Sequence, residues 1–286
     1  MGVHVVPVRF ETDDRFELSG AWFESPAPER VIVLHGATAV PARYYRRFAE
    51  WLTTERNAHV LIYDYRDIGL SAQRSARRST ADMAAWGVLD SAAALDFALD
   101  TYPDLPVWTV GHSLGGMCLG FHPNAGRIER HIAIASGPAH WIQHPWTAMP
   151  KIVAFWFLVG PACVTTLGYF PGRLFGSKVD LPAAAYWQWR RWCMNAEFHR
   201  VDWGRALPEP TPERVRCPVE LVAFADDDLI PPHQVKKLGR FYPHAETIFR
   251  CIEPEDVGLQ RIGHIAGFSA RCEPAWAHMV RDVRLQ

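Results

Sequence analysis

The sequence has almost no net charge and no cysteine pattern that would cross-link it. Its 286 residues include 30 Lys and Arg and 31 Asp and Glu side chains, which give a formal net charge of −1. This balance provides no electrostatic case for a nucleic acid partner. The six cysteines are scattered, with no Cys-x-x-Cys pair, which indicates reduced thiols and a cytoplasmic setting rather than a disulfide framework.

Targeting and cofactor motifs are also missing. The first residues lack a charged segment followed by an apolar one, and Val6 stands where a myristoylation signal requires Ser or Thr. We therefore expect neither a secretory signal nor that lipid. No P-loop or dinucleotide fingerprint is present. His140 and His144 could share one side of a helix, but Pro145 follows and no third ligand is evident, so we expect no metal and no other cofactor.

Strand and helix patterns alternate along much of the chain. Hydrophobic residues make up 49% of it, enough for one large core. We expect strands near residues 3–10, 16–23, 31–34, 59–63, 106–110, 131–135, 219–224 and 246–251. We expect helices near residues 42–54, 81–101 and 234–241, and a last one from about residue 269. This alternation implies a mostly parallel sheet flanked by helices.

A Gly-x-Ser-x-Gly motif follows one of these strands, at residues 111–115. Behind a strand and ahead of a helix, this pattern is typical of a nucleophile elbow. Ser113 would stand on a tight, strained turn that presents its Oγ to a substrate. Gly111 and Gly115 would have to lack a Cβ, because strand and helix approach closely there.

An acid and a base follow in the order that such a nucleophile needs. Three aspartates, 226–228, come directly after the strand at residues 219–224. The spacing Asp-x-Leu-Ile-Pro favours Asp227 as the acid, and Asp226 and Asp228 stay open as alternatives. His264 lies between two glycines in a later loop and completes the order Ser, Asp, His. A neutral imidazole can take the serine proton and later return it.

Backbone donors for an oxyanion are expected at two places. The strand at residues 31–34 is followed by His35-Gly36-Ala37-Thr38. Fixed N–H groups stabilise the negative charge that develops in acyl transfer. The candidates are the amide of Leu114, next to the nucleophile, and the amide of Ala37. We expect His35 to brace its loop rather than to take part in chemistry.

These motifs together resemble the α/β-hydrolases, and most closely the bacterial hydrolases grouped with the serine aminopeptidase-like branch. The resemblance is carried by residues 34–36, 64–71, 111–116, 227–231 and 262–264, which span most of the chain. It implies the α/β-hydrolase fold. One departure is Asp67, since relatives usually have glycine after the arginine; it puts the shape of that loop in doubt.

Residues 138–213 interrupt the alternation, between core segments 1–137 and 214–286. They hold seven of the chain's 12 tryptophans. In hydrolases that the chain resembles, a lid is inserted here, and an aromatic lid could form an apolar acyl or aryl pocket. Residues 152–172 are uncharged and long enough to span a bilayer. Gly160-Pro161 in their middle favours two short lid helices, with surface contact to a membrane as the less favoured alternative.

The sequence therefore predicts a serine hydrolase that cleaves a carboxylic ester or thioester with a small apolar or aromatic acyl group. An acyltransferase would use the same acyl-enzyme, and a non-catalytic small-ligand binding protein on a hydrolase scaffold is a third interpretation. Peptidase activity is less favoured, because a pocket for an amino terminus needs carboxylates. Only Asp180, Glu197 and Asp202 are acidic between residues 137 and 209. The oligomeric state stays open.

Overall fold

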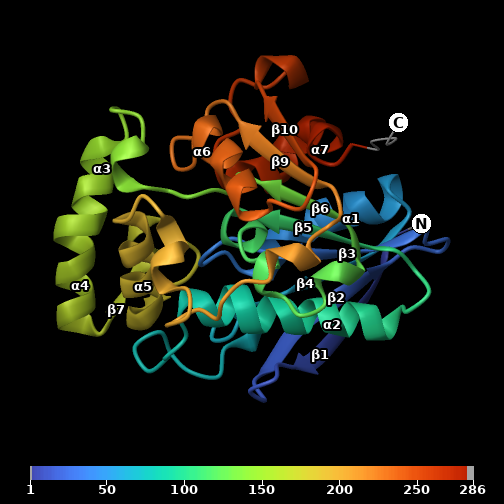
Figure 1. Ribbon diagram of the computed structural model, residues 1–286, viewed down its shortest axis with the longest axis horizontal. Coiled ribbons are helices and arrows are strands. Elements are labelled where there is room, and N and C mark those ends of the chain that lie inside the picture. Colours follow the sequence, from blue (N-terminus) through green and yellow to red (C-terminus); the bar gives the residue numbers. More distant parts are fainter. Residues whose placement is uncertain (1, 282–286) are drawn as a thin grey trace.

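A computed structural model describes residues 2–281. It contains an eight-stranded sheet in the order β1-β2-β4-β3-β5-β6-β9-β10 (Figure 1). β1 pairs antiparallel with β2 and β2 with β4, while all other neighbours are parallel. This confirms the mostly parallel sheet. The strands are β1 (His4–Glu11), β2 (Glu17–Glu24), β3 (Arg30–His35), β4 (Ala58–Tyr63), β5 (Val107–His112), β6 (Ile128–Ile134), β9 (Val219–Phe224) and β10 (Thr247–Ile252).

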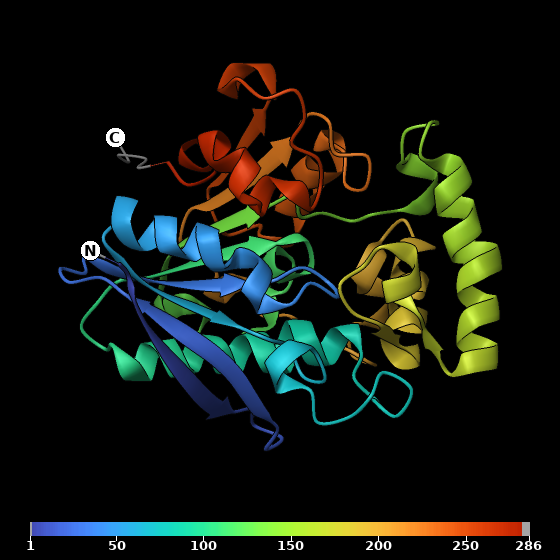
Figure 2. The ribbon, with the colours of Figure 1, turned by 180° about the vertical axis from the view of Figure 1, so that it is seen from behind.

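The central strands are buried on both faces, as parallel strands between helices should be. Because side chains alternate along a strand, Val31 and Val33 of β3 enter one core and Ile32 and Leu34 enter the other. α2 (Ser91–Thr101) and α6 (Pro232–Lys237) cover the first face. α1 (Arg46–Glu55) and α7 (Glu273–Met279) cover the second, and Figure 2 shows α1 and α2 on opposite sides of the sheet.

Three of the expected helices begin with a 3₁₀ or π-helical turn rather than with an α-helical one. The segment from residue 42 opens as a 3₁₀ turn, Ala42–Tyr45, before α1. A π-helical turn, Ala85–Asp90, precedes α2. The last α-helix begins at Glu273 rather than near residue 269, because Ala270–Cys272 form a 3₁₀ turn. Helix ends often tighten or widen in this way, and sequence periodicity does not resolve it.

The segment between β6 and β9 adds no strand to the large sheet. It forms α3 (Met149–Val153), α4 (Gly160–Leu167), the short pair β7 (Tyr169–Phe170) and β8 (Leu181–Pro182), and α5 (Ala183–Cys193). α3, α4 and α5 stand to one side of the sheet, at the left of Figure 1. We call residues 138–213 the inserted segment.

The expectation of two short helices in residues 152–172 was wrong. A π-helical turn, Ala154–Val159, joins α3 to α4, so that Met149–Leu167 is one helix of 19 residues. Pro161 has no N–H to donate, and it sits in the first turn of α4, directly after the widened π turn. The helix ends at Gly168, which has the positive φ of 79° common at such ends.

Candidate active site

Ser113 stands on a tight turn at the end of β5, as the motif predicts. Its φ is +54°, in the left-handed region that costs a residue with a side chain about 1–3 kcal/mol. A Cβ on Gly111 would lie 2.3 Å from the carbonyl oxygen of Gly115. A Cβ on Gly115 would lie 2.3 Å from the carbonyl oxygen of His35. Neither gap admits an atom, so both glycines are required by the close approach of β3, β5 and the turn.

Asp227 contacts His264, and His264 lines the same cavity as Ser113. Oδ2 of Asp227 lies 2.7 Å from Nδ1 of His264. Oδ1 of the same carboxylate accepts hydrogen bonds from the amides of Leu229 and Ile230, at 2.8 and 2.9 Å. Asp227 is only 2% exposed, so these bonds fix the carboxylate in one orientation. The carboxylate in turn fixes the orientation of the imidazole ring, because it contacts Nδ1 of His264 and leaves Nε2 for another partner.

The three aspartates that the sequence could not separate have three different environments. Asp226 accepts hydrogen bonds from the amides of Ile262 and Gly263, both at 2.9 Å, and so holds the loop that carries His264. The Asp228 side chain is 57% exposed. The hydrogen bond to the imidazole is made by Asp227. No sequence signal marks Asp226 as the residue that anchors the histidine loop, so this role was not predicted.

A buried chain of hydrogen bonds links the loop after β3 to the loop of His264. The Ala37 amide donates to Oη of Tyr45 at 2.8 Å, and Oη lies 2.8 Å from Nδ1 of His112. Nε2 of His112 lies 3.0 Å from the carbonyl oxygen of His264. Burial lowers the pKa of His112 well below its ordinary value, so the ring is neutral. Tyr45 then donates to Nδ1, and Nε2–H donates to the carbonyl.

The two expected oxyanion donors differ in their surroundings. The Leu114 amide belongs to the 3₁₀ turn Ser113–Gly116, directly after the nucleophile. The Ala37 amide is engaged with Tyr45. The loop that carries the Ala37 amide is held by a second tyrosine, since the Tyr65 hydroxyl donates to the carbonyl oxygen of Gly36 at 2.9 Å. His35 contacts the Tyr63 hydroxyl through Nδ1 at 2.7 Å, which is a bracing contact.

A cavity of about 230 Å³ opens above Ser113 and His264. The loop at residues 37–40 forms one wall, and Gly176, Ser177, Lys178 and Trp189 of the inserted segment form another. Trp189 is the tryptophan that reaches this cavity, while Trp156 and Trp192 are buried in the packing of the inserted segment. The volume is below the range of about 300–1,000 Å³ that is usual for ligand sites.

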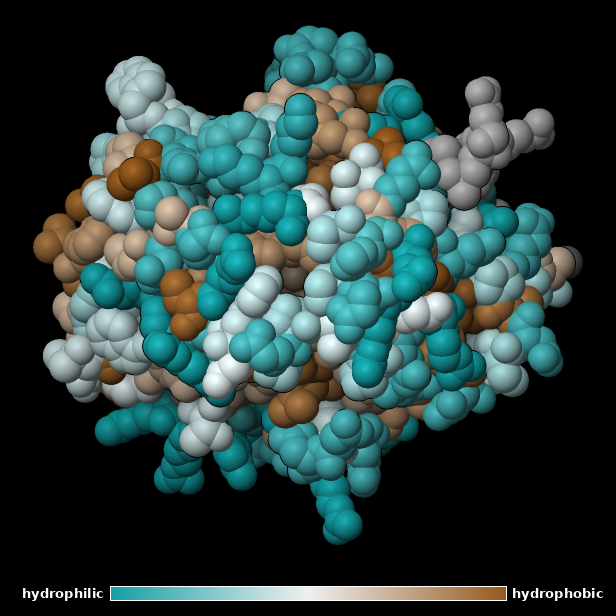
Figure 3. All heavy atoms as spheres, viewed as in Figure 1, coloured by the Kyte–Doolittle hydropathy of each residue, from teal (hydrophilic) through white to brown (hydrophobic). Residues whose placement is uncertain are grey.

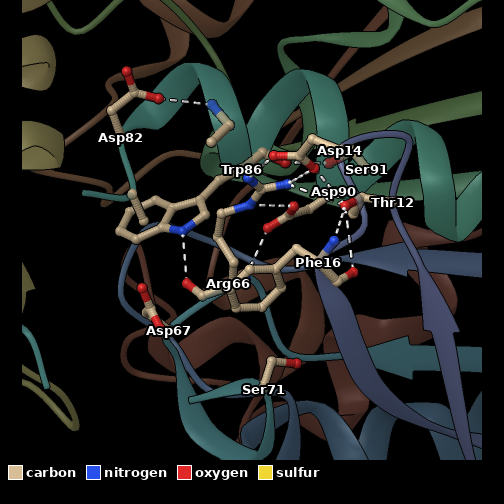
Figure 4. Close-up of polar contacts among 12 residues, drawn as sticks. Thr12, Asp14, Phe16, Arg66, Asp67, Ser71, Asp82, Trp86, Asp90 and Ser91 are labelled. Atoms are coloured by element: carbon tan, nitrogen blue, oxygen red, sulfur yellow. Dashed lines mark hydrogen bonds and ion pairs between the residues drawn. The ribbon is translucent and has the colours of Figure 1, made fainter. Parts of the chain in front are cut away.

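Arg66 organises the loop after β4 (Figure 4). Its guanidinium contacts Asp90 at 2.7 Å and Asp14 at 2.7 and 2.9 Å. The Arg66 guanidinium lowers the pKa of Asp14 to about 2. Burial raises the pKa of Asp90 to about 7, against the attraction of Arg66. Trp86 donates from Nε1 to the Arg66 carbonyl at 3.0 Å, so this cluster holds the backbone next to Tyr65.

Asp67 explains how the loop keeps its shape without the usual glycine. Its φ is +59°, a conformation that glycine adopts freely and that aspartate tolerates better than most residues. Its carboxylate accepts hydrogen bonds from the Ser79 hydroxyl at 2.6 Å and the Arg74 amide at 2.9 Å. The side chain therefore organises residues 73–79, a contribution that glycine would not make.

Within residues 2–281, no group of three or more His, Cys, Asp or Glu side chains is placed to hold a metal ion. His144 instead contacts the backbone carbonyl of Asp228 through Nδ1, at 3.2 Å. The polar groups around Ser113 are suited to proton transfer and to charge stabilisation by backbone amides. Such an arrangement can carry out nucleophilic acyl transfer.

Known proteins agree with this architecture. A family model described as "Serine aminopeptidase, S33" matches residues 25–184, more than half of the chain. An esterase of Pyrococcus furiosus superposes with a TM-score of 0.62 at 13% identity, covering 96% of this chain and 88% of its own. A Thermogutta terrifontis esterase gives 0.56 at 14%, with 96% of each chain covered. A Pseudomonas aeruginosa hydrolase gives 0.52 at 17%, covering 96% and 97%. No curated protein sequence matches.

Proposed function

The chain belongs to the serine aminopeptidase S33 family of α/β-hydrolases, and we propose that it cleaves a carboxylic ester or thioester through an acyl-enzyme on Ser113. The observation that carries the proposal is the contact of buried Asp227 with His264, which lines the same cavity as Ser113. Ser113 directly follows β5, Asp227 lies in the loop after β9 and His264 in the loop after β10, yet Ser113 and His264 line one small cavity and Asp227 contacts His264.

The reaction follows from this geometry. Ser113 Oγ attacks the substrate carbonyl carbon while Nε2 of His264 takes the hydroxyl proton. Asp227 keeps the imidazole in the required tautomer and stabilises the imidazolium. His264 then protonates the leaving alcohol or thiol as its bond to the carbonyl carbon breaks. Water, deprotonated by His264, attacks the acyl-serine, and the proton returns to Ser113 as the acid leaves.

The oxyanion would be held by the amides of Leu114 and Ala37. Each such donor is worth about 10²–10³ in rate. The Leu114 amide is fixed by the elbow itself. The Ala37 N–H would either donate a bifurcated hydrogen bond to the oxyanion and to Oη of Tyr45, or leave Tyr45 and donate to the oxyanion alone. Tyr45 would then hold the loop in place before the substrate arrives.

The cavity favours a small acyl group. At about 230 Å³ it is smaller than most ligand sites, and its walls include Trp189, Leu229 and Val40. We therefore propose a short apolar or aromatic acyl substrate. No step in this mechanism requires a cofactor.

The test is turnover of p-nitrophenyl esters of rising acyl length by the wild type and Ser113→Ala, side by side. We expect the short esters to be preferred and the variant to lose at least about 10³-fold in kcat. An equal melting temperature would show that Ser113→Ala is folded. Full turnover by that variant would overturn the proposal. Adding an alcohol acceptor would show whether the acyl group goes to water or to another nucleophile.

A further inference from the structure

The helix Met149–Leu167 presents an apolar side that no part of the described chain covers. By length and composition it is the one helix within residues 2–281 that is apolar enough to cross a membrane, and only 22% of its most apolar window is buried. Ile152, Trp156 and Val164 on its inner side are buried within the molecule. Because one side of this helix packs against the rest of the molecule, the helix could lie along a membrane surface but could not cross the bilayer without separating from its own domain.

The outer side of this helix carries large apolar side chains. Val153 is 37% exposed, Phe157 38%, Leu158 65% and Leu167 41%. We call these four residues the apolar face. Figure 3 shows hydrophobic atoms at the left edge of the molecule, where Figure 1 places α3 and α4. Between Leu158 and Leu167 the exposed residues include Thr165 and Thr166, so the apolar face is interrupted by hydroxyl groups. Exposed apolar side chains gathered on one helix mark a candidate binding surface.

Basic side chains flank the apolar face. Residues 152–172 are uncharged, with Lys151 before them and Arg173 after them, both exposed. Residues 138–193 contain five Lys and Arg side chains and one acidic one, and the whole inserted segment contains seven Lys and Arg and five Asp and Glu, in a chain whose formal net charge is −1. Trp146, just before the helix, is 84% exposed. Tryptophan is common at the boundary between lipid and water.

We propose that the apolar face docks on an anionic lipid surface. Helices that lie in the interface of a bilayer bury an apolar side while cations contact the headgroups. Long basic side chains can keep their stems on apolar surface and their charges in water. A second copy of the chain fits less well, because a two-fold contact through this face would bring like charges together.

Flotation with vesicles tests the docking without reference to hydrolysis. One set contains phosphatidylcholine alone, and in the other about a third is phosphatidylglycerol. We expect the anionic set to bind more protein, and binding to weaken when salt is raised to about 0.5 M. Leu158→Ser with Leu167→Ser should weaken binding by about tenfold or more. Lys151→Glu should weaken it by at least about fivefold.

The matched control variants change exposed residues outside the inserted segment. Leu70→Ser changes a leucine that is 81% exposed, and Arg9→Glu reverses an exposed charge on the β1–β2 hairpin. We expect both controls to bind vesicles as the wild type does. Absence of binding to anionic vesicles, or equal binding by the Leu158 and Leu167 variant, would overturn the proposal. The proposal would also be overturned if the wild type sedimented as a dimer and the Leu158 and Leu167 variant sedimented as a monomer. Turnover of water-soluble esters should be unchanged in all variants, which separates this test from that of the proposed function.

Discussion

His112 donates a hydrogen bond from Nε2 to the backbone carbonyl of His264 at 3.0 Å, although the two residues are 152 positions apart. His112 directly precedes the proposed nucleophile, and His264 is the proposed base. One buried side chain therefore connects the two sides of the site. Its other nitrogen is bonded to Tyr45, which also holds the Ala37 amide. Tyr45 and His112 are positioning residues in our proposal, because they act on the backbone of groups that meet the substrate.

Tyr45→Phe should lower kcat about tenfold with little change in KM. The variant leaves the Ala37 amide and Nδ1 of His112 without their partner, and each buried unpaired group costs about 1–3 kcal/mol. Steady-state kinetics well below the melting temperature would measure the effect. Tyr102→Phe is the control, since its hydroxyl bonds Glu24 far from the site and its loss should leave kcat unchanged. A Tyr45→Phe enzyme as fast as the wild type would argue against positioning.

His112→Gln should keep more activity than His112→Leu. A glutamine amide can donate to the His264 carbonyl and accept from Tyr45, whereas leucine leaves both groups unpaired. Burial already keeps His112 neutral, so a neutral replacement loses no charge. We expect a loss in kcat of about threefold for His112→Gln and of about 30-fold for His112→Leu, because only leucine leaves the two buried groups unpaired. Equal losses in both variants would show that ring volume matters rather than hydrogen bonding.

Substitution of each of the three aspartates by asparagine should give three different results. Asp227→Asn can stabilise the wrong tautomer of His264, and we expect kcat to fall by about 10⁴-fold. Asp226→Asn leaves one amide of the histidine loop without a carboxylate oxygen, for a loss of about tenfold. Asp228→Asn should have little effect, because that side chain is largely exposed. If Asp226→Asn were the most damaging of the three, the assignment of the acid would be wrong.

Asp14→Asn should reduce stability fully above about pH 4 and progressively less between about pH 4 and 2. The pKa of Asp14 is lowered from 3.8 to about 2, so its carboxylate stabilises the folded state above its unfolded pKa, and this contribution is lost as pH falls toward 2. Because the side chain is 47% exposed, solvent screening limits the effect to about 1 kcal/mol.

Melting temperatures across pH would measure the effect of Asp14→Asn. At neutral pH we expect a loss of roughly 2 °C for a chain of this size. The difference from the wild type should shrink as pH falls from about 4 to 2. Glu17→Gln, which breaks an exposed pair with Arg9, is the control and should change little at any pH. A difference that persisted at low pH would show that Asp14 acts through something other than its charge.

The sheet and the elbow could be predicted from the sequence because both depend on local patterns. Apolar runs of strand length alternate with helical periodicity, and the two glycines around Ser113 leave a distinctive spacing. The inserted helix was predicted less well. Gly160-Pro161 suggested a break, but the π turn before Pro161 accommodates the missing N–H without one. Such a turn depends on packing that local propensity does not encode.

The contacts that support the site could not be predicted in the same way. Tyr45 lies in a 3₁₀ turn before α1, and nothing in the local sequence indicates that its hydroxyl reaches both Ala37 and His112. Asp226 was recognised only as an alternative to Asp227. Its role depends on how the loop at residues 262–263 folds back over the end of β9. Long-range hydrogen bonds between loops carry no periodic signal in the chain.

The bonds made by Tyr45 and His112 have a consequence for divergence among relatives. Tyr45 also bonds the Ala37 amide, and His112 also bonds the His264 carbonyl. Both of these are main-chain groups. Any residue except proline at position 37 supplies the amide, and any residue at position 264 supplies the carbonyl. Drift at position 37 would leave the network intact. Tyr45 and His112 instead depend on each other's side chains, so a lineage that replaces one leaves the other with its main-chain partner alone. We expect the two positions to covary while the backbone they hold stays permissive.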